Sequence, residues 1–162
     1  MASVTPMKFL QDSALIERKT GELYDAFAKR FAGDTEVAEL FKSLSEDEYH
    51  HERALLLLER ILRGFNGEIK VSPDFGPMAE NLLQSLNKAL SMLGEGKSIT
   101  LESALNLALR IESTMIEEQD SNLIETESNE FRKTLKMLRN QTGEHRARLM
   151  AFIDRRKQVS RA

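Results

Sequence analysis

Five residues of this sequence combine a metal-binding side chain with a position where an apolar side chain is expected. Three are glutamates and two are histidines, and carboxylate oxygens together with imidazole nitrogens suit iron, manganese or zinc. Burying a carboxylate without a partner costs several kcal/mol or forces it to take up a proton. A bound cation would offset that cost for three carboxylates at once. The candidate metal ligands are Glu17, Glu48, His51, Glu112 and His145.

Glu48 and His51 interrupt the apolar seam of a long helix predicted around residues 37–65. Alternating steps of four and three residues define this seam, and all of its other positions are apolar. The i, i+3 spacing of Glu48 and His51 places both side chains on one face of the helix, aimed at one point. The seam consists of Val37, Phe41, Leu44, Glu48, His51, Leu55, Leu58, Leu62 and Phe65.

The elements that must position these side chains are helices, so we predict an all-α fold. Cap residues, glycines and prolines divide the chain into four long helices and one short helix. The short connection between the first two long helices predicts antiparallel neighbours. The segment 66–93, with its short helix, is then a crossover between two αα-hairpins, and the chain 1–162 is a single antiparallel four-helix bundle. The long helices are predicted over residues 7–31, 35–64, 101–124 and 130–156, and the short one over residues 78–93.

An internal repeat relates the two halves of the chain. An offset of 94 residues takes His51 to His145, and an offset of 95 takes Glu17 to Glu112. Bundles that hold two metal ions use one Glu from each of two helices and a Glu-x-x-His pair from each of the other two. The sequence therefore supplies all of these ligands except one, whose position is occupied by Thr142.

Two replacements for the missing carboxylate are conceivable. A water ligand could use the room left by Thr142, or Glu144 could swing in from the neighbouring position. Helix geometry disfavours the second option, because Glu144 points about 160° away from the direction of Thr142.

Other polar residues near the seams are predicted to have structural roles. Tyr24 lies two turns from Glu17 on the same row and is predicted to be a core residue, with a redox or hydrogen-bonding role as the alternative. The neighbours of the Glu48–His51 pair that fall outside the seam are predicted to form an exposed surface. They are Glu46, Asp47, His50 and Glu52.

Composition narrows the classes of function. The sequence contains no cysteine, which excludes disulfides, iron–sulfur clusters, thiolate zinc sites and a rubredoxin-type iron centre. The net charge of −3 argues against nucleic acid as the main partner. The longest apolar run, 54–58, is far shorter than the ~20 residues that span a bilayer. No signal peptide is apparent, and the expected location is cytoplasmic.

A competing interpretation is a nucleic-acid or membrane surface on the last helix. It would use Arg146, Arg148, Arg155, Arg156, Lys157 and Arg161.

These motifs resemble the ferritin-like superfamily, and most closely its rubrerythrin-related members. The resemblance covers nearly the whole chain and implies a di-iron centre whose ligands are the five candidate residues. Rubrerythrins proper carry a further Glu one turn beyond the third-helix ligand, where this sequence has Met115, and Thr142 is a second departure. The matching stretches are Ala14-Leu-Ile-Glu17 with Tyr24, Phe41-Lys-Ser-Leu44, Glu48-Tyr-His-His51 and Ala108-Leu-Arg-Ile-Glu112.

Two functions of different classes follow. The first is a metal-binding oxidoreductase of the peroxidase or ferroxidase type, with iron as the expected metal and zinc or manganese as alternatives. Its substrate would be oxygen, peroxide or ferrous iron, and its electron donor is unidentified. No nucleic acid or membrane partner is expected, and the protein would form a homodimer. The second is a non-catalytic assembly or partner-binding protein with a degenerate site or a structural zinc, which the missing carboxylate motivates.

Overall fold

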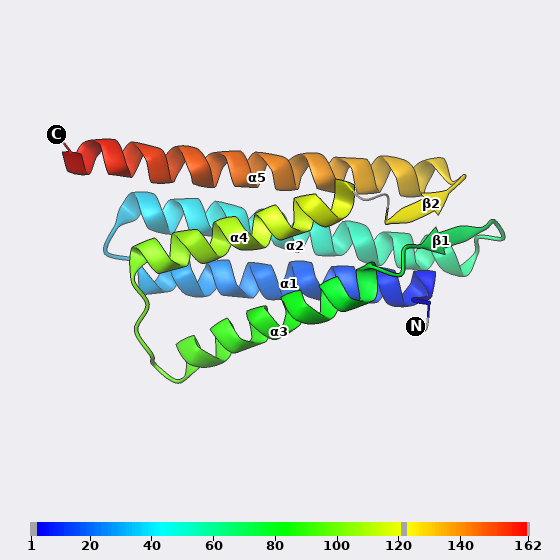
Figure 1. The fold of residues 1–162 in the computed structure, drawn as a ribbon, viewed down its shortest axis with the longest axis horizontal. Helices are drawn as coiled ribbons and strands as arrows, with labels where there is room; N and C mark the ends of the chain where they lie inside the picture. The colour runs from blue at the N-terminus through cyan, green and yellow to red at the C-terminus, as the bar shows by residue number, and fades with distance from the viewer. Residues whose placement is uncertain (1–2, 121–122, 162) are drawn as a thin grey trace.

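The computed structural model describes residues 3–120 and 123–161, without the side chains of residues 116–120. Helices dominate the described chain and confirm the predicted all-α bundle. In Figure 1, α1, α2 and α5 follow the long axis of the molecule, while the shorter α3 and α4 run obliquely to it. The elements are α1 (Pro6–Arg30), α2 (Thr35–Arg63), β1 (Ile69–Val71), α3 (Phe75–Gly94), α4 (Leu101–Asp120), β2 (Ile124–Thr126) and α5 (Asn129–Arg161).

The predicted helix caps are present. The Thr5 side chain accepts a hydrogen bond from the backbone N–H of Lys8, and Pro6 is the first helical residue of α1. Asp34 accepts from the backbone N–H of Val37 and so starts α2 only a few residues after α1 ends. These caps fix where the first two long helices begin.

Helix α1 packs most extensively on α2, and the two run antiparallel. Arg18 meets Glu52, whereas Gly21, further along α1, meets Ser45, which lies earlier on α2. A Cβ atom at Gly21 would approach the ring of Tyr49 to 3.2 Å, so the glycine permits this close approach of the two helices. The register brings the middle of α1 against the middle of α2.

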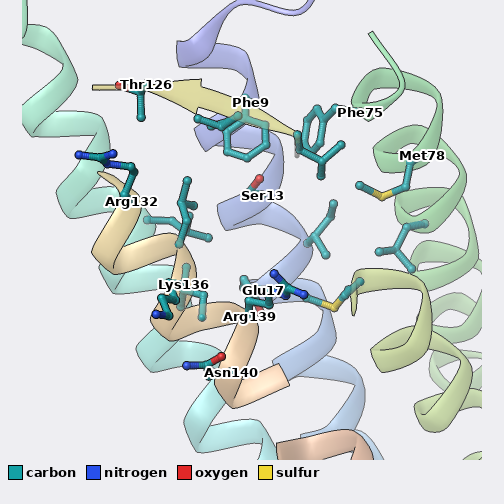
Figure 2. Close-up of a pocket in the computed structure, with 18 residues that line it drawn as sticks. Phe9, Ser13, Glu17, Phe75, Met78, Thr126, Arg132, Lys136, Arg139 and Asn140 are labelled. Atoms are coloured by element: carbon teal, nitrogen blue, oxygen red, sulfur yellow. The ribbon is translucent and has the colours of Figure 1, made fainter. Parts of the chain in front are cut away.

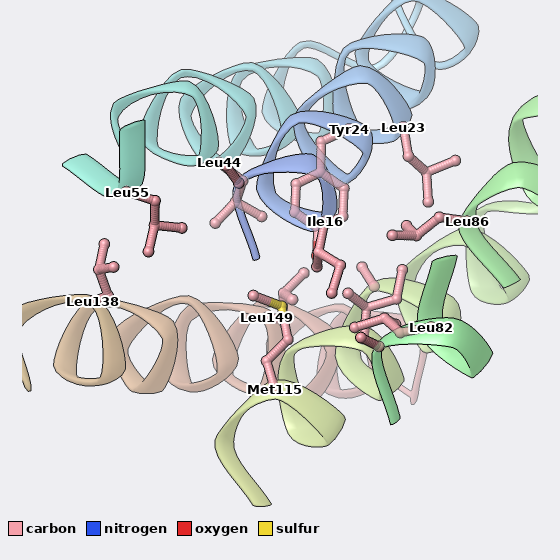
Figure 3. Packing of buried hydrophobic residues seen from close by; sticks show 14 of the residues in the cluster. Ile16, Leu23, Tyr24, Leu44, Leu55, Leu82, Leu86, Met115, Leu138 and Leu149 are labelled. Atoms are coloured by element: carbon pink, nitrogen blue, oxygen red, sulfur yellow. The ribbon is translucent and has the colours of Figure 1, made fainter. Parts of the chain in front are cut away.

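Helix α5 packs on α4 and also crosses α2 in the antiparallel sense. Arg148 donates to the Ser43 hydroxyl, and Arg155 donates to Glu36, which is nearer the start of α2. In Figure 3, Leu44 and Leu55 of α2 point toward Leu138 and Leu149 of α5. All four leucines are buried, so apolar packing flanks the polar centre of the bundle.

A small β-ladder joins the two halves and was not predicted. Strands β1 and β2 pair antiparallel, with Ile69 opposite Thr126 and Val71 opposite Ile124. The predicted helix 101–124 is therefore wrong at its end, because Ile124 belongs to a strand. The β-branched residues at alternate positions suit an extended backbone. The crossover does contain the predicted extra helix, α3, which packs along α1.

Two arginines of the basic C-terminal segment are engaged within the fold. Arg156 donates to Asp34 at 2.7 Å, and Arg155 contacts both carboxylate oxygens of Glu36 at 3.3 Å. Both guanidinium groups also lie over the ring of Phe152. These contacts give the charges an intramolecular role at the start of α2. Across the described part of the chain, no helix is both long and apolar enough to cross a membrane.

Candidate metal centre

The structure brings all five candidate ligands together in the middle of the bundle. Glu17 comes from α1, Glu48 and His51 from α2, Glu112 from α4 and His145 from α5. Each of the five residues is at most 3% exposed. Residues that lie far apart in the sequence thus converge in the dry interior, as their seam positions predict.

The five side chains form two overlapping groups that could each hold a metal ion. One group is Glu17, Glu48 and His51, and the other is Glu48, Glu112 and His145. Within each group the potential ligand atoms lie within 4.8 Å of one another. Glu48 belongs to both groups, so its carboxylate lies between the two candidate metal positions.

The imidazole nitrogens face the carboxylates. His51 Nδ1 lies 3.5 Å from Glu17 Oε2 and 3.6 Å from Glu48 Oε2. His145 Nδ1 lies 2.8 Å from Glu48 Oε1, and 3.7 Å from Glu112 Oε1. One oxygen of Glu48 therefore faces each histidine, which is the arrangement of a carboxylate shared by two ions.

The buried polar atoms of this cluster fit a metal. Nearly all buried polar atoms in proteins have a hydrogen-bond partner. In the described residues, the buried side-chain atoms without one belong only to the five candidate ligands. Two cations bound by carboxylate oxygens and imidazole nitrogens would satisfy them. The unpartnered atoms are Glu17 Oε2, Glu48 Oε1 and Oε2, His51 Nδ1, Glu112 Oε2 and His145 Nδ1.

In the absence of a metal, the pKa values of three candidate ligands are raised, so that these side chains hold protons. Burial lowers the pKa of His51, but the close carboxylates of Glu17 and Glu48, 3.5 and 3.6 Å from Nδ1, outweigh it and raise that pKa to about 11. For His145, Glu112 and Glu48 likewise overcome burial and raise the pKa to about 10. Burial and the charge of Glu48 raise the pKa of Glu17 well above its usual range. Without metal, the centre thus holds positively charged imidazoles among its carboxyl groups.

Two further residues orient the histidines and were not predicted to do so. His51 Nε2 lies 2.6 Å from Gln141 Oε1, and His145 Nε2 lies 3.2 Å from Asp47 Oδ2. Such partners on the outer nitrogen direct the inner nitrogen at a metal. The side chain of Asp47 is 44% exposed, so it lies on the surface as predicted and reaches His145 from there. The offset of 94 that relates the histidines also takes Asp47 to Gln141, so the repeat could have revealed this crosswise pair.

Tyr24 is buried, as predicted, and takes the hydrogen-bonding role given as its alternative. Its hydroxyl donates a 2.7 Å hydrogen bond to Glu112 Oε1. Burial and the charge of Glu112 raise the pKa of Tyr24 well above its usual range, so the hydroxyl keeps its proton. Four- and three-residue steps from Glu112 pass through Met115 to Gln119, so the sequence predicts that Gln119 continues the seam of this helix; its side chain lies outside the described ones.

The position of the missing carboxylate contributes no free ligand atom. Thr142 is buried, but its hydroxyl donates to the carbonyl oxygen of Leu138 in its own helix. Glu144 is exposed, in agreement with the direction expected from helix geometry. Met115, at the second departure from the rubrerythrin pattern, is buried beside the centre and lines a cavity.

The other polar residues near Glu48 and His51 that were predicted to be exposed differ in their actual exposure. Glu46 and His50 are exposed as predicted. The prediction of an exposed Glu52 is wrong, because its carboxylate is buried and accepts a 2.7 Å hydrogen bond from Arg18 Nε. Arg18 lies one residue after Glu17, so this ion pair fixes the segment of α1 that carries the candidate ligand Glu17 against α2.

The fold and the buried carboxylate–histidine cluster together define a ferritin-like domain. The family model for rubrerythrin matches residues 8–153, and the chain belongs to the rubrerythrin family. Comparisons with curated proteins and with solved structures give no significant match.

Proposed function

We propose that this protein binds two metal ions, with iron as the resident metal, and uses them to react with oxygen or peroxide or to oxidise ferrous iron. The buried atoms of the five candidate ligands that have no hydrogen-bond partner are the main support for this proposal. Carboxylates and imidazoles without a partner in a protein core cost free energy unless a cation binds them. Membership of the rubrerythrin family supports iron as the metal. When bound, a pair of iron ions would supply the electrons and the Lewis acidity for this chemistry.

The side chains have distinct roles in this proposal. Glu17 and His51 would hold one ion, Glu112 and His145 the other, and Glu48 would be shared. Each ion would have three protein ligands, which leaves coordination positions for water or substrate. The Tyr24 hydroxyl would hold Glu112 in place through its hydrogen bond to Oε1.

Metal content and oxygen reactivity test the proposal together. Protein loaded with ferrous iron without oxygen should contain about two iron ions per chain. Exposure to air should then consume oxygen and produce oxo-ferric absorbance. The Glu48→Ala variant should lose iron at both positions, whereas the control Glu46→Ala, exposed on the same helix, should keep it. Wild-type protein without iron at these positions would contradict metal binding, and iron without oxygen consumption would contradict the redox reaction.

The second candidate function is a non-catalytic assembly or partner-binding protein with a structural zinc. The engaged hydroxyl of Thr142 favours it, because the fourth carboxylate of a complete six-ligand centre has no substitute there. Elemental analysis of freshly purified protein separates the two functions, since stoichiometric iron contradicts this one and stoichiometric zinc contradicts the first. The peroxidase or ferroxidase type of reaction, the homodimer and the cytoplasmic location stay predictions.

A further inference from the structure

A cavity of about 370 Å³ adjoins the candidate metal centre. Glu17 is both a candidate ligand and a residue of the cavity wall. In Figure 2, the cavity lies between α1, α3 and α5, with Phe9 and Phe75 at one end and Glu17 toward the other. The cavity thus gives a ligand of some size a place directly beside the metal ligands.

The wall of the cavity is largely apolar. Phe9, Phe75, Met115 and Leu138 line it, and all four side chains are buried. Ligand pockets in proteins typically have volumes of about 300–1,000 Å³ and such apolar walls. A water molecule occupies only about 30 Å³ in the liquid, so oxygen or peroxide alone needs far less room. The size and the surface of the cavity therefore suit an apolar group of many atoms.

Positive charge gathers where the cavity reaches the surface of α5. Arg132, Lys136 and Arg139 line it, and their spacing places them on one face of that helix. All three are exposed, whereas the acidic residue of the lining, Glu17, is buried. Arg132 Nη2 donates to Asn129 Oδ1, which fixes its guanidinium group at the start of α5. The cavity is thus apolar inside and cationic where it meets solvent.

We propose that this cavity binds an unbranched fatty acid, with its carboxylate at Arg132 and Lys136 and its hydrocarbon tail among Phe9, Phe75 and Met115. Burial of the tail drives binding, and the cations select an anionic head group. The tail passes beside Glu17, so the ligand would be a substrate or regulator of the centre. Only this role as substrate or regulator rests on the proposed function, since the binding itself needs no metal.

The test is calorimetric titration of the purified full-length protein with decanoate. Decyltrimethylammonium, which has the same tail and the opposite head charge, is the control ligand. We expect saturable binding of decanoate, with about one molecule per chain, and no saturable binding of the ammonium compound. Two ligands that bind equally well, or decanoate that does not saturate, would overturn the proposal.

Variants locate the head group and the tail. Lys136→Glu should weaken decanoate binding about tenfold. Lys133→Glu makes the same change of charge at an exposed position of α5 that does not line the cavity, and should leave binding unchanged. Ser13→Phe should fill the cavity and abolish binding. If Ser13→Phe fails to fold, the two lysine variants still test the proposal, because both lysines are exposed and their substitution leaves the core intact. Equal affinity of the two lysine variants would overturn the proposed position of the head group.

Metal analysis of the same samples separates this proposal from the function proposed above. Decanoate binding by protein that takes up no metal would support the cavity and contradict the metal centre. Stoichiometric iron without decanoate binding would support the metal centre and contradict the cavity.

Discussion

His51 and His145 stack at the centre of the bundle, with ring centroids 5.3 Å apart and an angle of 17° between the ring planes. The two residues are equivalent in the internal repeat, and the oxygens of Glu48 lie near both rings. Two imidazoles with high pKa values would repel each other at this distance. The buried carboxylates offset this repulsion, so protons and metal ions compete for one set of side chains.

The first prediction concerns pH. In the folded protein without metal, the pKa values of His51 and His145 rise from 6.5 to about 11 and about 10. The folded state therefore keeps protons that the unfolded state releases above pH 6.5. This contribution to stability is complete below pH 6.5 and is lost as the pH rises toward 10. The free energy of unfolding should fall by about 1 kcal/mol per pH unit for each histidine.

Urea unfolding of chelator-treated protein between pH 6 and pH 9 measures this slope. Protein loaded with metal is the control, because its histidines have no proton to lose. A stability that rises over this interval in the metal-free protein would contradict the assignment of both protons.

The second prediction concerns the partners of the histidines. Asp47→Ala and Gln141→Ala each remove the group that orients one imidazole. Each should weaken the affinity for ferrous iron about 10–100-fold. Competition with a coloured chelator under nitrogen measures the affinity, and the exposed Glu46→Ala variant is the control. An unchanged affinity in both variants would show that the outer contacts do not position the rings.

The third prediction concerns Tyr24. The change Tyr24→Phe leaves Glu112 Oε1 without its hydrogen-bond donor in a dry site. The free energy of unfolding of the metal-free protein should fall by about 1–3 kcal/mol. Bound iron should reduce this loss, since a cation satisfies the same carboxylate. Parallel urea titrations measure both values. An equal loss of unfolding free energy with and without iron would show that Glu112 does not bind the metal.

The fourth prediction restores the missing carboxylate. The change Thr142→Glu places a further acid in the buried centre. Without metal, this burial should lower the free energy of unfolding by about 1–3 kcal/mol. With iron it should increase affinity, since the complete six-ligand pattern is restored. Iron titrations followed by thermal unfolding test both effects, and a variant with weaker iron binding would place Thr142 away from the metal positions.

The sequence was sufficient to predict that these five polar residues are buried together, because they stand at positions where apolar residues are expected. Glu17 lies two turns from Leu10 and Tyr24 on one row of its helix, Glu112 lies one turn from Ala108 and Met115, and the repeat pairs the two acids. Glu52 was misjudged because its partner, Arg18, lies on another helix and no local pattern reveals it. The prediction of a single domain remains untested, although the family match spans most of the chain.

The β-ladder and the cavity depend on tertiary packing. Strands of three residues, such as 69–71, are too short for a periodic signal, and their pairing becomes evident only in three dimensions. The cavity forms where α1, α3, α5 and β2, together with Leu55 of α2 and Met115 of α4, leave space beside Glu17. No spacing within one helix predicts such a volume.

Anomalous diffraction from crystals of iron-loaded protein tests the central claim most directly. Data collected on both sides of the iron edge locate iron independently of other metals, and data at the manganese and zinc edges test the alternatives. We predict two iron peaks, one among Glu17, Glu48 and His51 and the other among Glu48, Glu112 and His145. Iron-loaded crystals with no anomalous peak within this cluster would contradict the claim that these five residues form a dinuclear metal centre.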